Sequence, residues 1–190
     1  MMFATIAIAL GTVQLSNISQ DQRDILEKTD QTSRLRDRAF IYFSDPVLVK
    51  WPPPPNAIEV IGTNINYTNA GNMPGRRVVI QYFCIWPLNK EAPADPYIGA
   101  VWQKLEATNV IGPKQPFSLQ GCQIPFAAFQ DAMDGKRRII IAMRATYIDG
   151  FDLKTERVTE MTRVLRFGSK KEMSIGFIGP HNCSDEDCSQ

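Results

Sequence analysis

KRRIIIAMRATYIDGFDLKTERVTEMTRVLRF, residues 136–167, is the stretch that decides the fold. Two sets of side chains alternate along its first half, with Ile139, Ile141, Met143, Ala145 and Tyr147 on one side and Ile140, Ala142 and Ile148 on the other. A period of two is typical of a β-strand. Asp149 and Gly150 then predict a loop, and the residues that follow predict a second strand.

Earlier segments continue the β pattern. Residues 39–44, 58–68, 76–86 and 116–124 are each predicted to form a strand. The segment 76–86 is apolar on both sides, as expected of a central strand that is covered on both faces. Residues 44–56, SDPVLVKWPPPPN, are expected to form an irregular connection, because consecutive prolines cannot join a central ladder.

One short helix is predicted in PFAAFQDAMDG, residues 125–135. Pro125 suits the first turn of a helix, and Gly135 suits its end. Six or seven irregularly spaced strands with one short helix predict a mainly β fold. The expected architecture is an immunoglobulin-like antiparallel β-sandwich.

The loop NAGNMPG, residues 69–75, has the composition of a specific turn. Gly71 is expected to adopt a positive φ, and Asn69 and Asn72 are expected to hydrogen-bond to the loop backbone. Because the loop is too long for a two-residue hairpin, the strands on either side of it can lie in different sheets. Its glycines do not follow the pattern of a phosphate-binding loop.

The N-terminal part of the chain differs from the rest. Residues 1–15 are uncharged and mostly apolar, which predicts a membrane helix, whereas a buried core helix is the alternative. Residues 16–38 contain five acids and five bases and no glycine or proline, which predicts a solvated helical stalk capable of weak self-association. The sandwich is expected over residues 39–178, followed by a flexible tail over residues 179–190.

Charge and composition exclude some functions. The chain of 190 residues has 21 basic and 20 acidic side chains, so its net charge of +1 gives no reason to expect nucleic-acid binding. It contains one histidine, His181, which excludes most chemistry that needs paired imidazoles. The basic clusters Arg76–Arg77 and Lys136–Arg138 are expected at solvated strand ends, with contact to acidic lipid head groups as the alternative.

Two groups of residues are candidates for chemistry. Asp149 and Asp152 bracket the hairpin loop, where they are expected to form the turn; a calcium site or an acid–base pair is the alternative. Cys183 and Cys188 lie near His181, but the sequence offers no second ligand pair for a tetrahedral zinc site. No catalytic, cofactor-binding or metal-binding residue is therefore predicted.

The remaining cysteines are expected to be structural. Cys84 falls within an apolar strand and is expected to be a small buried hydrophobic residue. Cys122 follows a glycine near the end of a predicted strand.

A family resemblance rests on turn and strand motifs at three places. These are Arg38, Ala39 and Phe40, then Asn69, Gly71 and Pro74, then Gly135, Lys136, Tyr147, Asp149 and Phe151. In this respect the chain resembles a family of uncharacterised bacterial membrane-anchored proteins with an N-terminal transmembrane helix and an immunoglobulin-like domain. The resemblance covers most of residues 1–167 and departs from the family in the short N-terminal helix and the C-terminal tail. It implies a fold and an anchor but no activity.

The resemblance and the apolar N-terminus together predict a single-pass protein of the bacterial inner membrane. Arg23, Lys28 and Arg34 follow the apolar run and no base precedes it, so the positive-inside rule favours a cytoplasmic domain. Free thiols would agree with a cytoplasmic domain, whereas a disulfide between Cys183 and Cys188 would agree with a domain outside the cytoplasm.

The expected function is that of a membrane-anchored, non-catalytic β-sandwich that binds a protein or an envelope component. Residues 1–15 are expected to contact membrane lipid, and no cofactor is expected. The alternative is an enzyme or metal-binding domain that uses Asp149 and Asp152 or the cysteines of the tail.

Overall fold

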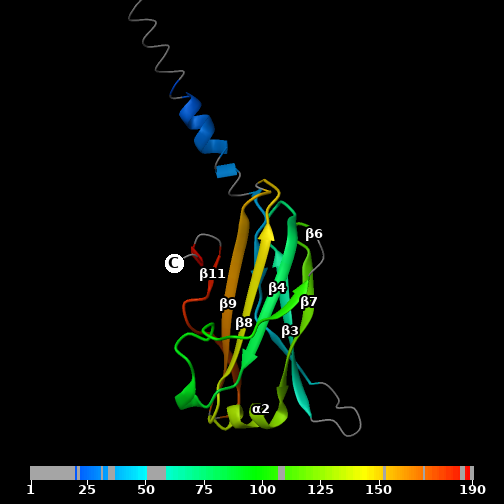
Figure 1. Cartoon of the computed structure of the whole chain (residues 1–190), viewed down its shortest axis with the longest axis vertical. Helices are drawn as coiled ribbons and strands as arrows, with labels where there is room; N and C mark the ends of the chain where they lie inside the picture. Colours follow the sequence, from blue (N-terminus) through cyan, green and yellow to red (C-terminus); the bar gives the residue numbers. More distant parts are fainter. Residues whose placement is uncertain are drawn as a thin grey trace, which may run out of the picture. The chain divides into compact units, whose positions relative to one another are not determined.

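In a computed structural model of the chain, strand β8 (Ile139–Ile148) lies between β4 (Gly75–Ile85) and β9 (Glu156–Phe167) and is antiparallel to both (Figure 1). Both faces of β8 are covered, since Ile139 on one face and Ile140 on the other have no exposed surface. The hairpin predicted from the alternation of apolar residues is therefore confirmed. The strand predicted to be covered on both faces corresponds to β4, but β8 is more completely buried.

The structure describes residues 20, 22–30, 32–33, 37–50, 59–106, 110–151, 153–168, 170–184 and 187–188. The chain divides into two units, residues 1–38 and 39–190. In the first unit, residues 22–30 are helical and exposed. The predicted membrane helix, residues 1–15, lies outside the described residues. Within the described part of the chain, no helix has the length and apolar content needed to cross a bilayer.

The second unit is mainly β, as the sequence predicts. Its described strands form two antiparallel sheets. Sheet A contains β1 (Ile41–Phe43), β2 (Val47–Lys50), β3 (Val60–Asn69) and β7 (Pro116–Pro125). Sheet B contains β4, β5 (Gln103–Glu106), β6 (Val110–Ile111), β8, β9, β10 (Met173–Phe177) and β11 (Cys183–Ser184).

Sheet A is built around β3. Strand β7 pairs with one side of β3, while β1 and β2 follow one another along the other side, opposite residues 67–69 and 61–64 respectively. The expectation of an irregular connection is wrong for residues 47–50, because these residues pair with β3 and form an edge strand. Their sequence shows no clear alternation of apolar and polar residues from which this strand could be predicted. Residues 51–58, which include the proline run, lie outside the described residues.

Sheet B has the order β10-β9-β8-β4-β5, with β11 also beside β9 and β6 beside β4. Strand β10 pairs with residues 163–167 of β9, and β11 pairs with residues 159–160. The tail was expected to be flexible, but at Cys183 and Ser184 the structure joins it to the sheet. Two-residue strands of this kind leave no period in the sequence from which to predict them.

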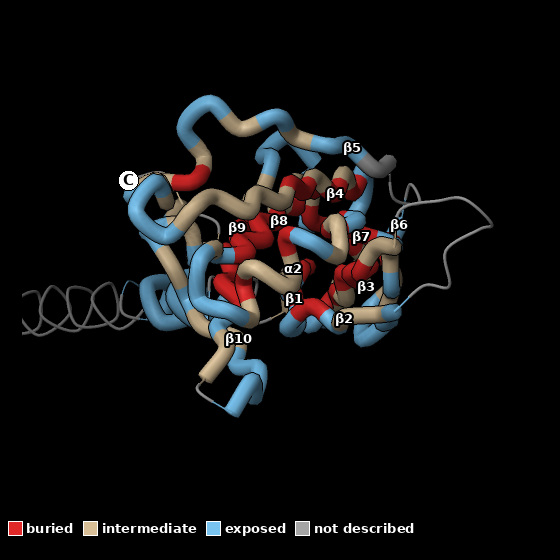
Figure 2. The backbone as a smooth tube through the Cα atoms, turned by 90° about the horizontal axis from the view of Figure 1, so that it is seen from below, coloured by how far each residue is buried: buried red, intermediate tan, exposed pale blue. Residues whose placement is uncertain are grey.

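The core lies between the two sheets, where Figure 2 shows the buried segments of β1, β3, β7, β4, β8 and β9 close together. Helix α2 (Phe126–Met133) closes one end of this core, with Ala128 and Ala132 buried. The ring of Phe129 lies 5.3 Å from that of Phe167. The predicted helix is confirmed, and it ends before Gly135, whose φ is +73°.

A disulfide and an ion pair are among the contacts that connect sheet A to sheet B. A disulfide joins Cys84 of β4 to Cys122 of β7, so the expectation that Cys84 is simply a small buried hydrophobic residue is wrong. Beside β1, the guanidinium of Arg163 lies 2.6 Å from a carboxylate oxygen of Asp45. Because β7 and β1 are on opposite sides of β3, the two sheets are held together near both edges of sheet A.

The loop between β3 and β4 is organised by the buried side chain of Asn69. Its Oδ1 accepts hydrogen bonds from the backbone N–H groups of Phe40 and Gly71, both at 3.0 Å. Its Nδ2 donates to the carbonyl oxygens of Met73 at 2.7 Å and Ile111 at 3.2 Å. The predicted role of Asn69 is confirmed, and the loop does join strands of different sheets.

The expectation for Gly71 is wrong, because its φ is not positive. The residue in the left-handed region is Arg77, with a φ of 49°. Arg77 lies where the pairing of β4 with β8 shifts register between Arg76 and Val79. The unusual backbone conformation is therefore required by the bulge in β4, after the loop has ended.

We expect Asn69→Ala to lower the free energy of unfolding by about 2–4 kcal/mol, because it leaves buried backbone groups without hydrogen-bond partners. The exposed Ser118 of β7 is the control, and Ser118→Ala should change stability by less than about 0.5 kcal/mol. Equilibrium unfolding in urea measures both values. Equal losses in the two variants would contradict the central role of Asn69.

The two disulfides should differ in their contribution to stability. Cys84 and Cys122 are 38 residues apart, whereas Cys183 and Cys188 are 5 apart, so the first bridge restricts the unfolded chain more. Replacing Cys84 and Cys122 together by Ser should lower the free energy of unfolding by about 2–4 kcal/mol. Replacing Cys183 and Cys188 together should cost less. A larger loss from the second replacement, measured by urea unfolding without reductant, would oppose this account.

Candidate functional site

The outer face of sheet B is covered by two segments that are far apart in the sequence. The segment after β4 brings Tyr97 and Trp102 onto Phe83, with ring centroids 5.7 and 4.7 Å from the Phe83 ring. The segment after β10 brings His181 over β9, where the residue pair Arg144 and Glu160 spans β8 and β9. The nearest guanidinium nitrogen and carboxylate oxygen of that pair are 3.4 Å apart.

His181 joins these segments. Its Nδ1 lies 2.8 Å from a carboxylate oxygen of Glu160, and its Nε2 lies 3.1 Å from one of Asp95. Its ring stacks on Tyr97, with centroids 3.5 Å apart and planes at 15°. We call Asp95, Tyr97, Arg144, Glu160 and His181 the His181 cluster.

The environment of the His181 cluster fixes two of its protonation states. The backbone N–H of Tyr97 donates to Asp95 at 2.8 Å and, with the His181 ring, lowers the pKa of the Asp95 carboxyl. Burial raises the pKa of the Tyr97 hydroxyl. Asp95 is therefore ionised and Tyr97 protonated at neutral pH. Because both ring nitrogens of His181 are engaged, the cluster holds the tail and the loop of Asp95 against sheet B.

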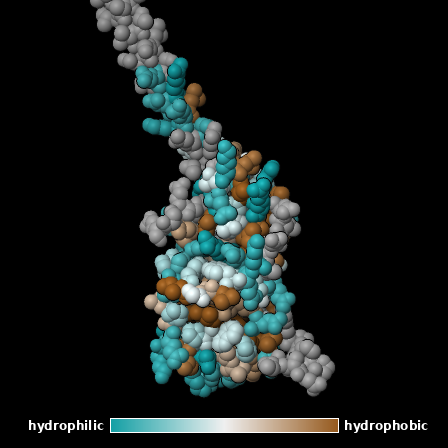
Figure 3. Space-filling view, in the orientation of Figure 1, coloured by the Kyte–Doolittle hydropathy of each residue, from teal (hydrophilic) through white to brown (hydrophobic). Residues whose placement is uncertain are grey.

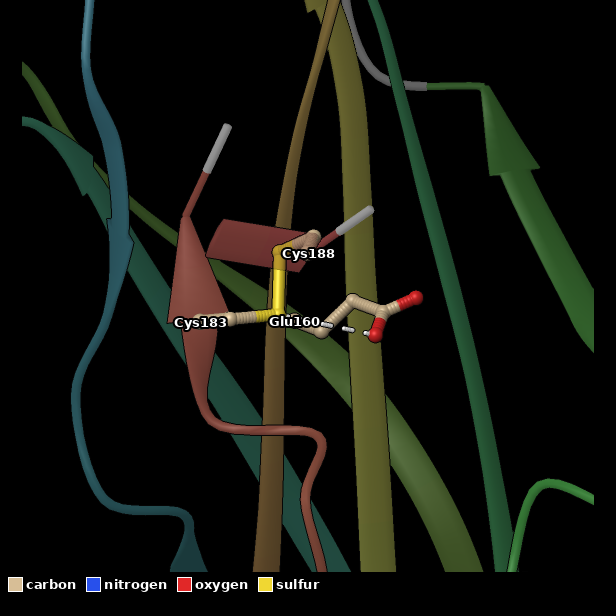
Figure 4. Close-up of side chains that lie close together, drawn as sticks. All are labelled: Glu160, Cys183 and Cys188. Atoms are coloured by element: carbon tan, nitrogen blue, oxygen red, sulfur yellow. Dashed lines mark hydrogen bonds between the residues drawn. A yellow bond between two sulfur atoms is a disulfide. The ribbon is translucent and has the colours of Figure 1, made fainter. Parts of the chain in front are cut away.

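Cys183 and Cys188 lie beside this cluster and form a disulfide, shown with Glu160 in Figure 4. The Cys183 sulfur is 3.7 Å from a carboxylate oxygen of Glu160. One donor atom from each of the three residues lies within 4.8 Å of the others. However, zinc is bound by thiolates, and here the two sulfur atoms are bonded to each other. With the disulfide formed, the two cysteines link two parts of the tail covalently and do not provide thiolate ligands.

Asp149 has the position of a turn residue, as predicted. Its Oδ1 accepts a hydrogen bond from the backbone N–H of Phe151 at 2.9 Å. Its Oδ2 lies 3.2 Å from the guanidinium of Arg157 across the hairpin, and the side chain is buried. Asp152, the other carboxylate considered for calcium or for acid–base chemistry, lies outside the described residues.

A groove opens between β1 of sheet A and the strands β9, β10 and β11 of sheet B. We call it the edge groove; its volume is about 280 Å³. Tyr42 and Phe177 line it and remain 49% and 67% exposed. The Arg163 guanidinium lies 3.9 Å from the centroid of the Phe177 ring and forms part of the wall. The hydroxyl of Thr159, also in the wall, is buried and has no hydrogen-bond partner among the described residues.

The two basic clusters lie at opposite ends of β8. Arg76 pairs with Ile148, the last residue of β8, whereas Arg138 immediately precedes its first residue. In Figure 1 the second end carries α2. The face of the domain seen in Figure 3 carries small hydrophobic patches separated by hydrophilic side chains, and no single large apolar area dominates it.

Comparison of the chain with family models, curated proteins and solved structures gives no match. The resemblance to membrane-anchored proteins therefore stays a prediction. The geometry of the edge groove and of the His181 cluster is what bears on function.

Sequence reasoning missed several residues of these sites, among them Asp95, Tyr97, Thr159, Glu160 and Phe177. Asp95 and His181 are separated by 86 residues, and no local period connects them. The one available signal was chemical: a single histidine in a chain rich in acids is expected to find a carboxylate partner. Which carboxylate it contacts depends on the pairing of β8, β9 and β11.

Asp95→Asn should give a pH-dependent loss of stability. Because the folded state lowers the pKa of Asp95, its contribution is present above the ordinary carboxyl pKa of about 4 and is lost as the pH falls through the lower folded-state value. The variant should be less stable at pH 7 by under about 1 kcal/mol, since the Asp95–His181 pair is partly exposed. The difference from wild type should shrink steadily as the pH falls below the ordinary carboxyl pKa of about 4.

Urea unfolding at several pH values measures this difference, with the exposed Glu91→Gln as a control for general acid effects. A loss of stability in Asp95→Asn that is constant with pH would show that the carboxylate is not stabilised by its charge.

Proposed function

We propose that the chain is a non-catalytic binding module of the bacterial envelope. In this proposal, an immunoglobulin-like β-sandwich is anchored to the inner membrane by residues 1–15 and binds an extended segment of a partner protein in the edge groove. The observation that carries the proposal is that the exposed Tyr42 and Phe177 line one groove with Thr159, whose buried hydroxyl has no hydrogen-bond partner among the described residues.

The strand order supports an immunoglobulin-like arrangement. In that fold, the second and fifth strands pair in one sheet, while the third, sixth and seventh pair in the other. Here β3 pairs with β7, and β4, β8 and β9 are neighbours. The disulfide departs from the antibody pattern, because Cys84 and Cys122 join β4 to β7, whereas in antibodies the strands equivalent to β3 and β8 are joined.

The groove has features that suit a protein segment. Exposed aromatic side chains are frequent anchors of protein interfaces, and Tyr42 and Phe177 provide two. Within the described residues, β1 pairs with β3 on one side only, so its other edge offers backbone donors and acceptors to an added strand. The Thr159 hydroxyl in the groove wall is buried and has no partner among the described residues, which is costly for such a group. In this proposal, the bound segment displaces the side chains that cover the hydroxyl and supplies the missing hydrogen bond.

The disulfides indicate on which side of the membrane the sandwich domain lies. Disulfides persist in oxidising compartments, and the described cysteines form two of them. We infer that the domain faces the periplasm, the side opposite to that favoured by Arg23, Lys28 and Arg34.

The alternative of an enzyme or a metal-binding domain has less support. Asp149 is engaged by Phe151 and Arg157, and Cys183 is bonded to Cys188. These contacts give both groups a structural role in the folded domain.

The proposal is tested by Thr159→Val and by photo-crosslinking of the full chain in bacterial membranes. A photoreactive residue at position 177 or at position 42 should crosslink to the same partner segment, whereas one at Leu153, also exposed, should not. Thr159→Val keeps the shape of the side chain, so it should reduce crosslinking at position 177 about five- to twentyfold without lowering stability.

Three results would contradict the proposal. One is equal crosslinking from all three positions, which would indicate random contact. Another is different partners for positions 42 and 177. The third is a Thr159→Val variant that crosslinks as well as the wild type.

A further inference from the structure

Two arginines face each other at the α2 end of sheet B. Ile139 and Leu165 are paired across β8 and β9, so the antiparallel pairing places the next two residues, Arg138 and Arg166, opposite one another. Side chains alternate between the faces of a sheet. Since Leu165 points into the core, Arg166 points to the outer face of β9; Arg138 directly precedes β8, and both arginines are exposed.

Like charges in directly opposed positions destabilise a sheet unless an opposite charge lies between them. Three acids lie near these arginines: Asp131 and Asp134 are paired with other bases, and the Glu172 carboxylate lies over Gly168, two residues from Arg166. Asp131 lies 3.1 Å from the guanidinium of Arg137, and Asp134 lies 3.3 Å from the ammonium of Lys136. Among the described residues, no carboxylate pairs with Arg138 or Arg166.

Arg138 and Arg166 line the same cavity, which has a volume of about 310 Å³. Its polar lining comes from Asn89, Arg137, Arg138 and Arg166, and no acidic residue contributes to it. Val164 and Ile178 provide apolar wall. On β10, Gly176 lies beside the Arg166 side chain, whose Cζ is 3.5 Å from the position that a Cβ at residue 176 would take, an ordinary contact distance.

We propose that Arg138 and Arg166 form a binding site for the phosphate group of a small organic molecule. The guanidinium group presents donors in a planar fork that matches phosphate oxygens, and two arginines line one cavity here. The volume is at the lower end of the range for ligand pockets, so it fits a phosphate with a compact organic group. The apolar wall of Val164 and Ile178 takes that organic group.

This site is independent of the edge groove. The two cavities share no lining residue, and the edge groove lies on the side of β9 that faces β1. A failure of one proposal therefore leaves the other intact.

The test is isothermal titration calorimetry of the full chain in detergent, at fixed ionic strength, with phenyl phosphate and with inorganic phosphate. We expect one saturable site, with phenyl phosphate bound more tightly than inorganic phosphate. Arg138→Gln and Arg166→Gln should each weaken phenyl phosphate binding about tenfold or more. Arg76→Gln and Arg77→Gln are matched controls, because they remove the same charge at the other end of β8 and should leave the affinity unchanged.

Thermal unfolding without ligand separates loss of binding from loss of structure. Because each variant removes a repulsion between opposed charges, Arg138→Gln and Arg166→Gln should melt at or above the temperature of the wild type. Vesicles of phosphatidylglycerol and of phosphatidylcholine distinguish a lipid head group from a soluble phosphate.

Several results would overturn the proposal. These are the absence of saturable phenyl phosphate binding, equal weakening in all four variants, or melting of Arg138→Gln and Arg166→Gln below the wild type. Binding of phosphatidylglycerol vesicles that depends on Arg138 and Arg166, without binding of phenyl phosphate, would reassign the site to a membrane surface.

Discussion

The burial of both faces of β8 is the constraint on which the rest of the domain depends. Its inner face, with Ile139, Ile141 and Met143, is covered by sheet A, but its outer face also carries Ile140 and Ala142 without exposed surface. Leaving such side chains in water would forfeit about 25 cal/mol for each Å² of apolar area. The loop of Tyr97 and the tail of His181 are therefore needed as a third layer over β8 and β9.

The third layer requires polar side chains that hold the loop and the tail against the outer face of sheet B. Loops carry polar backbone groups that must be satisfied when they lie on a sheet. The contacts of His181 with Glu160 and Asp95 hold the tail and the loop to β9. Asn69 does the same for the loop between the sheets, and Arg163 links β9 to Asp45. Thr159 in the edge groove and the pair Arg138 and Arg166 have no such partners among the described residues, and these are the residues we propose to bind other molecules.

The long elements of this fold could be predicted from the sequence, because each strand from β3 to β9 with eight or more residues shows apolar side chains on a buried face. Of the short strands, β1 falls within the strand predicted for residues 39–44, but others could not be predicted. β2, β5 and β10 have four or five residues each, and their existence depends on a neighbour rather than on their own composition. The candidate sites could not be predicted either, because their contacts also depend on elements far apart in the sequence. Asp45 and Arg163, which contact each other, are 118 residues apart, and the pairing of Cys84 with Cys122 depends on the packing of β4 on β7.

The short strands β10 and β11 also change how β9 meets its surroundings. An exposed long edge strand is a template on which other chains can add, and this is a common start of aggregation. β9 has twelve residues, and its outer edge is covered in part by β10 and in part by β11, with the segment of His181 between them. The outer edge of the sheet is therefore formed by two separate short strands, and the Cys183–Cys188 disulfide links β11 to the residues that follow it. A chain shortened before residue 173 would expose the whole outer edge of β9. The C-terminal segment therefore covers the sheet and also prevents other chains from adding to this edge, which is how fibril-like assemblies grow.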